Sequence, residues 1–374
     1  MSWVPKSLDE LGYVGRGRSR HRPRDAAHLY GGPNPFVQTG DVKHAGLYLT
    51  EYTQTYSEAG LAQSRMWPAG TLCITIAANI ADTAILGFDA CFPDSVIGFI
   101  PDDKKADARF IKYLFDALLQ SRYKQFTQGA AQDNLSQAKL LSLKFPIPEI
   151  TEQKQIADVI SAYDDLIEHN RRRIQLLEQA ARLLYKEWFV HLRFPGHEHT
   201  RIIDGVPEGW EKTPLGAIAP LKYGKALKND DRVPGPFPVY GSSGIVGTHT
   251  KALVPGPSII VGRKGNVGSV YWSPDDCHPI DTVYFIDSVH CSFFLYYTLQ
   301  QMTFISTDVA VPGLNRDFAH SRSMLVADQK ILRLFEDTVS PLHQQMESLT
   351  RQNASLAKAR DLLLPKLMNG EVAV

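Results

Sequence analysis

The sequence predicts an α+β protein, in which two mixed α/β globular domains are separated and joined by two long helices that form an antiparallel coiled coil. Two observations predict this class. Two stretches carry apolar residues with heptad spacing, and two other stretches are rich in Gly, Pro, aromatic residues and short β-like runs. These features alternate along the 374 residues as globule, helix, globule and helix. The order indicates an internal repeat with pseudo-two-fold symmetry.

The two globular segments, residues 1–150 and 210–327, are weakly similar to each other. Short motifs recur in the same order in both, and three pairs carry the similarity: Pro35–Gly40 with Phe237–Gly241, Cys91–Asp94 with Cys277–Asp281, and Phe110–Tyr113 with Phe293–Tyr296. We therefore expect the two segments to share one fold. A chain of this length suits two or three domains.

The first long helix is expected from about Thr151 to Val190, a stretch without Gly or Pro. Pro146 and Pro148 end the preceding strand, so Thr151 is expected to be the N-cap. Apolar residues follow in alternating steps of four and three, which is the seam of a coiled coil. At 1.5 Å per residue, roughly 38 residues make a rod of about 57 Å. The expected seam residues are Ile160, Ile167, Asn170, Ile174, Leu177 and Leu184.

The second long helix is expected from about Asp328 to Met368. Pro341 falls inside its pattern and is expected to separate a short leading helix from the main one. Asn369-Gly370 supplies the C-terminal stop. The expected seam residues are Leu342, Leu349, Asn353, Leu356 and Leu363.

Each helix has one Asn in an otherwise apolar seam. A buried Asn in a coiled coil lowers stability and fixes the register. Alternatively, Asn170 and Asn353 lie at a wet edge of the seam; the sequence leaves both interpretations open. Neither helix can bury its leucine stripe alone, so we expect the two to pair. Because distant parts of one chain supply them, an antiparallel pair is the easiest to connect.

The composition limits how the protein can bind nucleic acid. Lys+Arg and Asp+Glu both number 40, so the formal net charge is zero. Non-specific affinity for nucleic acid comes from neutralising phosphates. Nucleic-acid binding would therefore depend on local basic patches or on partner subunits.

The cysteines and the N-terminus indicate a cytoplasmic protein. Cys73, Cys91, Cys277 and Cys291 have no zinc-site spacing and are expected to be small buried residues in a reducing compartment. The N-terminus lacks the pattern of a signal peptide, and no apolar run reaches the ~18 residues of a membrane span. We expect no membrane association.

The motifs that resemble active sites fail on inspection. Asn34-Pro35-Phe36 lacks one proline of the amino-methyltransferase motif, and no Gly-rich cofactor turn follows a strand nearby. The run from Gly256 to Lys264 has the wrong spacing for a P-loop. His197-Glu198-His199 lies in a Pro-Gly-rich linker without further ligands nearby. We expect neither a catalytic residue nor a metal site in this chain.

One catalytic pattern remains as an alternative. Asp94 followed by Asp102–Lys105 offers carboxylates and a lysine, which a metal-dependent phosphodiesterase needs. The second globule has no lysine at the matching place, so a charged surface turn explains the run more simply. A stand-alone nuclease is therefore the first alternative function, and a coiled-coil scaffold without a DNA role is the second.

Basic residues suited to DNA gather in the first globule. Five arginines occur within nine residues and no acid lies among them: Arg16, Arg18, Arg20, Arg22 and Arg24. Guanidinium groups bind phosphates and guanine edges with two hydrogen bonds. This cluster favours nucleic-acid binding over a simply solvated loop.

The second globule has basic and polar residues at comparable places. Lys222 and Lys225, with Lys228, fill the early position, and a Gly-flanked turn with Arg263 and Lys264 follows a strand. The remaining expected DNA-binding residues are Tyr240, Ser242, Ser243, Asn266, Asn315 and Arg316.

These residues resemble a known family. The run Glu152–Ile156, Lys186–Phe189 and Phe194–His197 resembles the central region of type I restriction specificity subunits. Pro238–Gly241, Ile259–Gly268 and Leu314–Arg316 are similar to a target-recognition domain of that family. The first globule resembles another subtype of this domain, although Gln38–Asp41 stands where a Tyr-Gly-Ser/Asn-Gly turn is usual.

The resemblance implies a domain order. It comprises target-recognition domain 1 (1–150), a central helical region (151–192), a linker (193–209), target-recognition domain 2 (210–327) and a C-terminal helical region (328–374). Each recognition domain would read one half of a split site in double-stranded DNA, and the helices would set the gap between the halves.

The resemblance also implies partners rather than cofactors in this chain. Two methyltransferase subunits that bind S-adenosylmethionine would dock on the helices and methylate adenine. Motor-endonuclease subunits that use ATP and Mg²⁺ would join them for cleavage.

Overall fold

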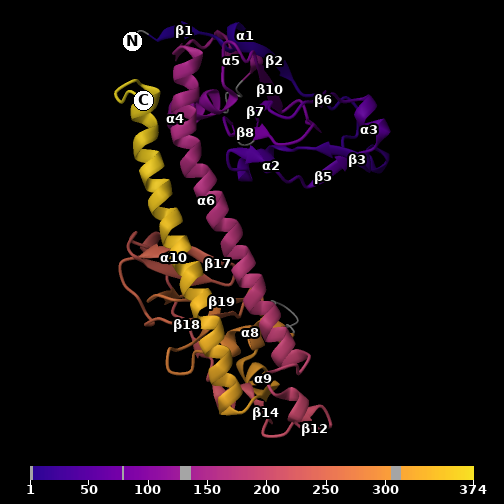
Figure 1. The fold of residues 1–374 in the computed structure, drawn as a ribbon, viewed down its shortest axis with the longest axis vertical. Helices are drawn as coiled ribbons and strands as arrows, with labels where there is room; N and C mark the ends of the chain where they lie inside the picture. Colours follow the sequence, from indigo (N-terminus) through magenta and orange to yellow (C-terminus); the bar gives the residue numbers. More distant parts are fainter. Residues whose placement is uncertain (1–2, 78–79, 127–135, 305–312) are drawn as a thin grey trace. The chain divides into compact units, whose positions relative to one another are not determined.

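The structure is a computed structural model that describes residues 3–77, 80–126, 136–304 and 313–374. The chain forms two compact units: unit 1 comprises residues 1–171 and 351–374, and unit 2 comprises residues 172–350 (Figure 1). The predicted α+β class is confirmed, because each unit combines small sheets with segments of two long helices. In the described part of the chain, no helix has the length and apolar character needed to span a membrane.

Unit 1 is built on two sheets. The larger has the strand order β2 (Gly12–Arg16), β10 (Val96–Pro101), β7 (Leu72–Thr75), β8 (Thr83–Leu86) and β4 (Tyr48–Leu49). The smaller has the order β5 (Gln54–Tyr56), β3 (Tyr30–Phe36), β9 (Ala90–Cys91) and β6 (Met66–Trp67). Strands β7 and β8 are fully buried and mostly apolar, which is why the sequence around β7 reads as a continuous β-like run rather than as an alternating one.

Short helices and one terminal strand pair complete the globular part of unit 1. The strand pair is β1 (Val4–Lys6) with β11 (Phe145–Ile147). The helices are α1 (Leu8–Leu11), a 3₁₀ turn (Ala27–Leu29), α2 (Thr39–His44), α3 (Glu58–Ala62), α4 (Ala108–Phe126) and α5 (Gln137–Ser142). The apolar face of α4 shares one core with strand β7 and with the first turns of the long helix α6 (Ile150–Tyr185). The last residues of the second long helix, α10 (Gln329–Met368), close the same core through Leu367 and Met368.

Unit 2 is also built on two sheets. The larger has the order β15 (Lys222–Tyr223), β21 (Val283–Ile286), β18 (Ser258–Gly262) and β19 (Val270–Ser273). The smaller has the order β17 (Gly244–His249), β16 (Phe237–Gly241) and β20 (His278–Pro279). Strand β14 (Glu211–Pro214) pairs with β22 (Ser323–Val326), and β12 (Ile202–Ile203) pairs with β13 (Val206–Pro207).

The helices of unit 2 enclose an aromatic core. They are a π-helical turn (Lys186–Val190) that continues α6, 3₁₀ turns at His197–His199 and Asn229–Asp231, α7 (Leu215–Ile218), α8 (Phe293–Gln301) and α9 (Arg316–Ser321). In this core, Tyr185 and Trp188 pack against Phe335 of α10, with ring centroids 6.2 and 5.8 Å apart.

The two units share one topology. In unit 1, β3 pairs in parallel with β9, and β10 lies between β2 and β7; in unit 2, β16 pairs in parallel with β20, and β21 lies between β15 and β18. The strand pair β1–β11 in unit 1 corresponds to β14–β22 in unit 2. The internal repeat predicted from a few short motifs therefore extends through both sheets, to which unit 1 adds the edge strands β4 and β6.

Backbone hydrogen bonds align the two copies residue by residue. Gly17 donates to the carbonyl of Val96 at 2.9 Å, as Gly224 donates to that of Val283 at 3.2 Å. A Cβ on either glycine would lie within 2.4 Å of a backbone carbonyl oxygen, so both strand ends require the same residue. The next residues, Arg18 and Lys225, donate to Phe92 and Pro279 at 3.1 and 3.0 Å.

The match of α4 with α8 needs a correction of two residues. The carbonyl of Asp107 accepts from Ile111 at 3.1 Å, and the carbonyl of Ser292 accepts from Tyr296 at 2.9 Å, so these two residues begin equivalent helices. Phe110 therefore corresponds to Leu295, not to Phe293. The similar Phe and Tyr residues gave a wrong alignment, because the two helices are equivalent when counted from their first residues and not from their aromatic residues.

Two expectations for the long helices were wrong. Helix α10 is continuous through Pro341, although Pro removes one backbone hydrogen bond. Pro341 and Asp337, whose carbonyl loses that donor, are both exposed, so water can satisfy the carbonyl while Val339 and Met346 hold the helix on the core. Helix α6 begins at Ile150, so Thr151 lies in its first turn rather than at its cap. The left-handed Gly370 (φ 75°) follows the end of α10, as expected for a C-terminal stop.

The predicted seam residues are buried to different degrees. Ile160, Ile167, Asn170 and Leu349 are buried, whereas Ile174, Leu177, Leu184, Leu342, Asn353, Leu356 and Leu363 are half-buried. The boundaries of the predicted domains do not coincide with the two units, which divide the chain inside both long helices. Those boundaries stay a prediction.

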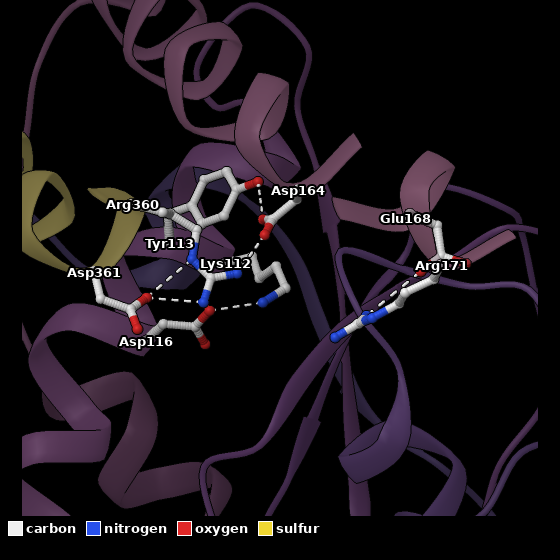
Figure 2. A network of polar contacts seen from close by, with 8 residues as sticks. All are labelled: Lys112, Tyr113, Asp116, Asp164, Glu168, Arg171, Arg360 and Asp361. Atoms are coloured by element: carbon white, nitrogen blue, oxygen red, sulfur yellow. Dashed lines mark hydrogen bonds and ion pairs between the residues drawn. The ribbon is translucent and has the colours of Figure 1, made fainter. Parts of the chain in front are cut away.

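The two seam asparagines contact each other inside unit 1. Asn170 Nδ2 donates to Asn353 Oδ1 at 2.9 Å, and Asn353 Nδ2 donates to the carbonyl of Ile167 at 3.3 Å. Asn170 is only 4% exposed, so the interpretation as a wet edge does not hold. Nearby, Asp164 of α6 accepts from Arg360 of α10, which fixes the helices as an antiparallel pair here (Figure 2).

The same carboxylate connects the helix pair to α4. Tyr113 of α4 donates to Asp164 Oδ2 at 2.7 Å, and burial together with the Asp164 charge raises the pKa of Tyr113 (Figure 2). Next to Tyr113 in the sequence, the buried Lys112 contacts Asp116 at 2.6 Å, and Asp116 also accepts from Thr83 of β8 at 2.8 Å. These bonds hold the sheet, α4 and the helix pair of unit 1 together.

Replacing one seam asparagine should cost more than replacing both. We expect Asn170→Leu to lower the stability of unit 1 by about 1–3 kcal/mol, because it leaves the side-chain oxygen of Asn353 without its donor. Asn170→Leu with Asn353→Leu should recover most of this loss. Urea unfolding of the full chain, analysed as a double-mutant cycle, measures the coupling. Additive losses would contradict the pairing.

A buried histidine of α10 makes unit 2 sensitive to acid. His343 Nε2 lies 2.8 Å from the hydroxyl of Tyr297, its ring stacks on Phe293 at 4.0 Å, and burial lowers its pKa from 6.5 to about 4. The folded state therefore prefers the neutral ring, while the unfolded state takes up a proton below pH 6.5. This stability is fully present above that pH and is lost as the pH falls toward 4.

We expect unit 2 to lose about 2 kcal/mol between pH 7.5 and 5 through His343. His343→Phe should flatten this dependence, although it removes a partner of Tyr297. Urea unfolding followed by tryptophan fluorescence measures both slopes, because Trp272 lies 5.8 Å from the His343 ring. The exposed His199→Ala is the control, and equal slopes in all three proteins would contradict the prediction.

Candidate nucleic-acid interface

The arginine cluster of unit 1 extends from the end of the edge strand β2. Exposed Arg16, Arg18 and Arg20 alternate with the buried Gly15, Gly17 and Ser19. Alternate residues of an extended chain point to the same side. The three arginines therefore share one solvent-facing side at this end of the sheet.

Intramolecular contacts divide the five arginines. Arg24 binds both carboxylate oxygens of Asp94 at 2.9 Å, and Arg16 Nε contacts the carbonyl of the same residue. Arg22 donates to the carbonyl of Ser19 at 2.7 Å. Within the described ranges, the guanidinium groups of Arg18 and Arg20 make no hydrogen bond or ion pair. These two are the arginines most available to a ligand.

The segment after α3 fixes the backbone of this cluster. Gln63 Oε1 accepts from the amides of Arg20 at 2.6 Å and His21 at 2.9 Å, and Ser64 Oγ donates to the carbonyl of Arg18 at 2.8 Å. The cluster is therefore a shaped loop rather than a freely moving one.

Sequence reasoning missed a sixth arginine, Arg65. Its guanidinium carbon lies 4.3 Å from the Trp67 ring centroid and 4.8 Å from that of Tyr13, whose hydroxyl it contacts at 2.6 Å. Arg65 directly follows Gln63 and Ser64, so it extends the same basic surface. A single Arg gives no cluster signal; the available signal was its spacing of two from Trp67, which places both on one side of a strand.

Two loops of unit 2 join beside the end of β18. Ser269 Oγ donates to the carbonyl of Ser242 at 2.6 Å, and the hydroxyl of Tyr271 donates to the same carbonyl at 3.2 Å. This brings the predicted residues Ser242 and Ser243 to the turn that carries Lys264 and Asn266. Exposed Ser243, Lys264 and Asn266 are free to contact a ligand there.

The predicted Arg263 and Arg316 lie against one tyrosine. Their guanidinium carbons are 5.0 and 5.2 Å from the ring centroid of Tyr223, which sequence reasoning had passed over. Asn315 is the N-cap of α9 and accepts from the amides of Asp317 and Phe318 at 2.9 and 3.0 Å. Its side-chain oxygen is therefore used within the fold, while Nδ2 remains a donor.

Two predicted binding residues of unit 2 are engaged elsewhere. Tyr240 is 5% exposed and packs with Val254, Ile260 and Cys277, so its ring belongs to the core. Lys222 pairs with Asp287, and this contact is the main cause that lowers the pKa of Asp287 to about 2. Lys225, by contrast, is exposed, and no side-chain partner of it lies in the described part of unit 2.

The basic residues occupy the same end of the larger sheet in both units. Arg18 and Lys225 follow equivalent edge strands, and Asp94 and Asp281 begin equivalent turns. The carbonyl of Asp94 contacts Arg16, and that of Asp281 accepts from Arg263 at 3.1 Å. A neutral chain thus carries two local basic surfaces at matching positions.

The carboxylates of the alternative catalytic pattern are bound to basic groups and to the backbone. Asp94 is bound to Arg24, while Asp102 accepts from the amide of Lys104 at 3.1 Å and pairs with Lys105 at 3.2 Å. Among the described residues, no group of three His, Cys, Asp or Glu side chains is arranged to hold a metal. Cys73, Cys91 and Cys277 are buried free thiols, and Cys291 is half-buried.

A repeated fold with a basic surface at the same sheet end of each copy is typical of proteins that bind a polyanion at two places. The family model described as "Type I restriction modification DNA specificity domain" matches residues 2–179 and 207–318. The chain belongs to this family, whose role is DNA sequence specificity in type I restriction-modification systems.

Individual relatives agree over nearly the whole length. The chain is 25% identical to the type I restriction enzyme MjaIX specificity subunit of Methanocaldococcus jannaschii, covering 100% of this chain and 94% of the relative. It is 25% identical to the HindI specificity subunit of Haemophilus influenzae, covering 90% and 94%. The crystal structure of the S subunit from M. genitalium has the same fold, with a TM-score of 0.61, 17% identity and coverage of 98% and 96%.

The available arginines of unit 1 provide a direct test of its basic surface. We expect Arg18→Ala with Arg20→Ala to weaken binding to duplex DNA by about tenfold at fixed salt, and to lower the salt slope by about 2. Fluorescence anisotropy over a salt series measures both values. The control replaces the exposed Arg201 and Lys212 by Ala. Equal affinities in the two double variants would remove these arginines from the interface.

Proposed function

We propose that this chain is the specificity subunit of a type I restriction-modification complex, which reads a bipartite DNA site and directs methylation and cleavage by partner subunits. The observation that carries the proposal is the repeated fold with a basic surface at the same sheet end of both units. Family membership supports the role in sequence specificity. Two copies of the same fold in one chain, each with a basic surface, favour a DNA site that has two halves.

The two halves of the site are expected to differ in sequence. Unit 1 offers the arginines Arg18, Arg20 and Arg65, which suit guanine edges and phosphates. Unit 2 offers Lys264, Asn266 and Ser243 at the corresponding sheet end. An Asn amide suits the edge of adenine, and a Ser hydroxyl can form hydrogen bonds with several bases. A single chain with two unlike surfaces therefore reads an asymmetric site.

In this proposal, the helices α6 and α10 set the gap between the half-sites. Their register is fixed by Asn170 and Asn353, so the helix pair cannot slide to fit other gaps. Half-site spacing then follows from the distance between two rigid readers.

We assign the chemistry to the partners. Two methyltransferase subunits bind S-adenosylmethionine and methylate adenine, and motor-endonuclease subunits use ATP and Mg²⁺ for cleavage. Exposed apolar side chains on the helices support docking of partners there, among them Leu166, Leu176, Leu183 and Leu362. The cytoplasm, which contains the DNA, is the expected location.

Mapping of methylated adenine in cells that express the chain with its methyltransferase partner tests the proposal. We expect one split, asymmetric motif that disappears when the chain is omitted. Methylation without this chain, or a continuous motif, would refute the proposal. Cleavage of DNA by the purified chain with a divalent metal would instead favour the nuclease, and the lack of any sequence preference in the complex would favour a scaffold.

A matched insertion tests the role of the helices. Four residues placed after Arg171 and four after Thr350 add slightly more than one turn, about 6 Å, to each helix while keeping Asn170 and Asn353 on the same side of the insertions. We expect the gap in the methylated motif to lengthen by about one or two base pairs, with both halves unchanged. Four residues inserted into α6 alone are the control, and should abolish methylation or leave the gap unchanged. An altered half-site in the matched variant would contradict the ruler.

A further inference from the structure

Tyr223 carries two arginines on the surface of unit 2. The guanidinium carbons of Arg263 and Arg316 lie 5.0 and 5.2 Å from its ring centroid, and Arg263 also lies 5.7 Å from that of Tyr284. Tyr223 is 48% exposed, so an aromatic ring with two cations beside it faces solvent. We call these three residues, Tyr223, Arg263 and Arg316, the Tyr223 platform.

A chain of hydrogen bonds fixes the backbone that bears both arginines. The amide of Arg263 donates to the carbonyl of Thr282 at 2.9 Å, and its carbonyl accepts from Leu314 at 2.8 Å. The carbonyl of Leu314 accepts from the hydroxyl of Tyr284 at 2.8 Å. Burial, followed by the neighbouring Tyr223, raises the pKa of Tyr284 to about 12, so this hydroxyl keeps the proton it donates.

A second bond ties the helix of Arg316 to the strand of Tyr223. His320 of α9 accepts from the amide of Leu221 through Nε2 at 2.9 Å. Burial and then the nearby Arg316 lower the pKa of His320, which keeps the ring neutral and able to accept. The platform is therefore held from both sides before any ligand arrives.

The acids around the platform leave its charge largely uncompensated. The polar partner of Arg263 is a backbone carbonyl, that of Asp281 at 3.1 Å. The nearest carboxylate to Arg316 is Asp317, 3.9 Å from Nε and 88% exposed. Asp287 is occupied by Lys222 and His290. Two cations beside one ring repel each other, and an anion between or beside them relieves that repulsion.

We propose that the Tyr223 platform binds the phosphate backbone of DNA and so positions unit 2 on the duplex, without reading bases. This inference rests on the proposed function and assigns one contact class within it. Phosphate contacts fix orientation and register, whereas base edges carry the sequence information. Arginines held against a ring lie close to the protein surface. This suits contact with the phosphates, which lie on the outside of a duplex. The free Lys264, Asn266 and Ser243 on the adjoining loops are left to read bases.

Tyrosine variants test the platform in the full chain together with its methyltransferase partner. We expect Tyr223→Leu to weaken binding by about threefold to tenfold, equally on duplex DNA that contains the methylated motif and on unrelated duplex. Tyr223→Phe should keep wild-type affinity, because the ring and not the hydroxyl holds the arginines. The control is Tyr52→Leu, another exposed tyrosine, on whose ring no cation from the described residues lies.

Arginine variants give a second measurement. Arg263→Ala with Arg316→Ala should lower the slope of log affinity against log salt by about 2, one for each lost phosphate contact. The methylated motif should stay the same in every variant. A changed second half-site would assign the platform to base reading and overturn the inference.

The remaining outcomes separate this inference from the proposed function. If these variants bind DNA like the wild type while Arg18→Ala with Arg20→Ala weakens binding, the Tyr223 platform does not bind phosphate, and the proposed function stands. If neither unit's variants change DNA binding, the proposed function fails together with the platform.

Discussion

The amide pair of Asn170 and Asn353 decides which residues of α6 face which residues of α10 in unit 1. Any shift along the helices would separate the two amides and leave buried polar atoms without partners, which costs about 1–3 kcal/mol for each. Asp164 and Arg360 pair farther along the same helices and confirm the antiparallel alignment. Because Tyr113 of α4 is bound to Asp164, the position of the sheet in unit 1 follows from the same register.

The second constraint is electrostatic. A chain with zero net charge can bind a polyanion only where its acids are kept away from its bases. Asp94 neutralises Arg24, and Asp287 neutralises Lys222, at the edges of the two basic surfaces. Arg18 in unit 1 and Lys225 in unit 2, whose side chains have no partner within the described ranges, occupy equivalent positions of the repeat. The two copies of the fold thus present charge at matching positions with different side chains.

Much of the fold was predictable because it depends on periodic patterns. Heptad spacing identified both long helices, and short motifs identified the repeat. Pro341 was misread because local preference was weighed without the packing of Val339 and Met346 on either side. At the sites, Arg24 and Tyr240 were misjudged for another reason: an acid 70 residues away and a core assembled from several strands are invisible in a linear pattern. Arg65 and Tyr223 were missed because isolated residues become a surface only after folding.

Unit 1 is not continuous in the sequence, since its core needs Leu367 and Met368 from the end of α10. All of unit 2 precedes these residues in the chain and is synthesised before they leave the ribosome. Unit 1 therefore begins to be synthesised first, but its core is completed last. Until then, the apolar residues that contact Leu367 and Met368 are exposed. A nonsense mutation near residue 350 would spare every residue of the first globular segment and still damage that segment, while unit 2 keeps all of its own residues. Genetic lesions at the far end of the gene would then affect the segment to which we assign the first half-site.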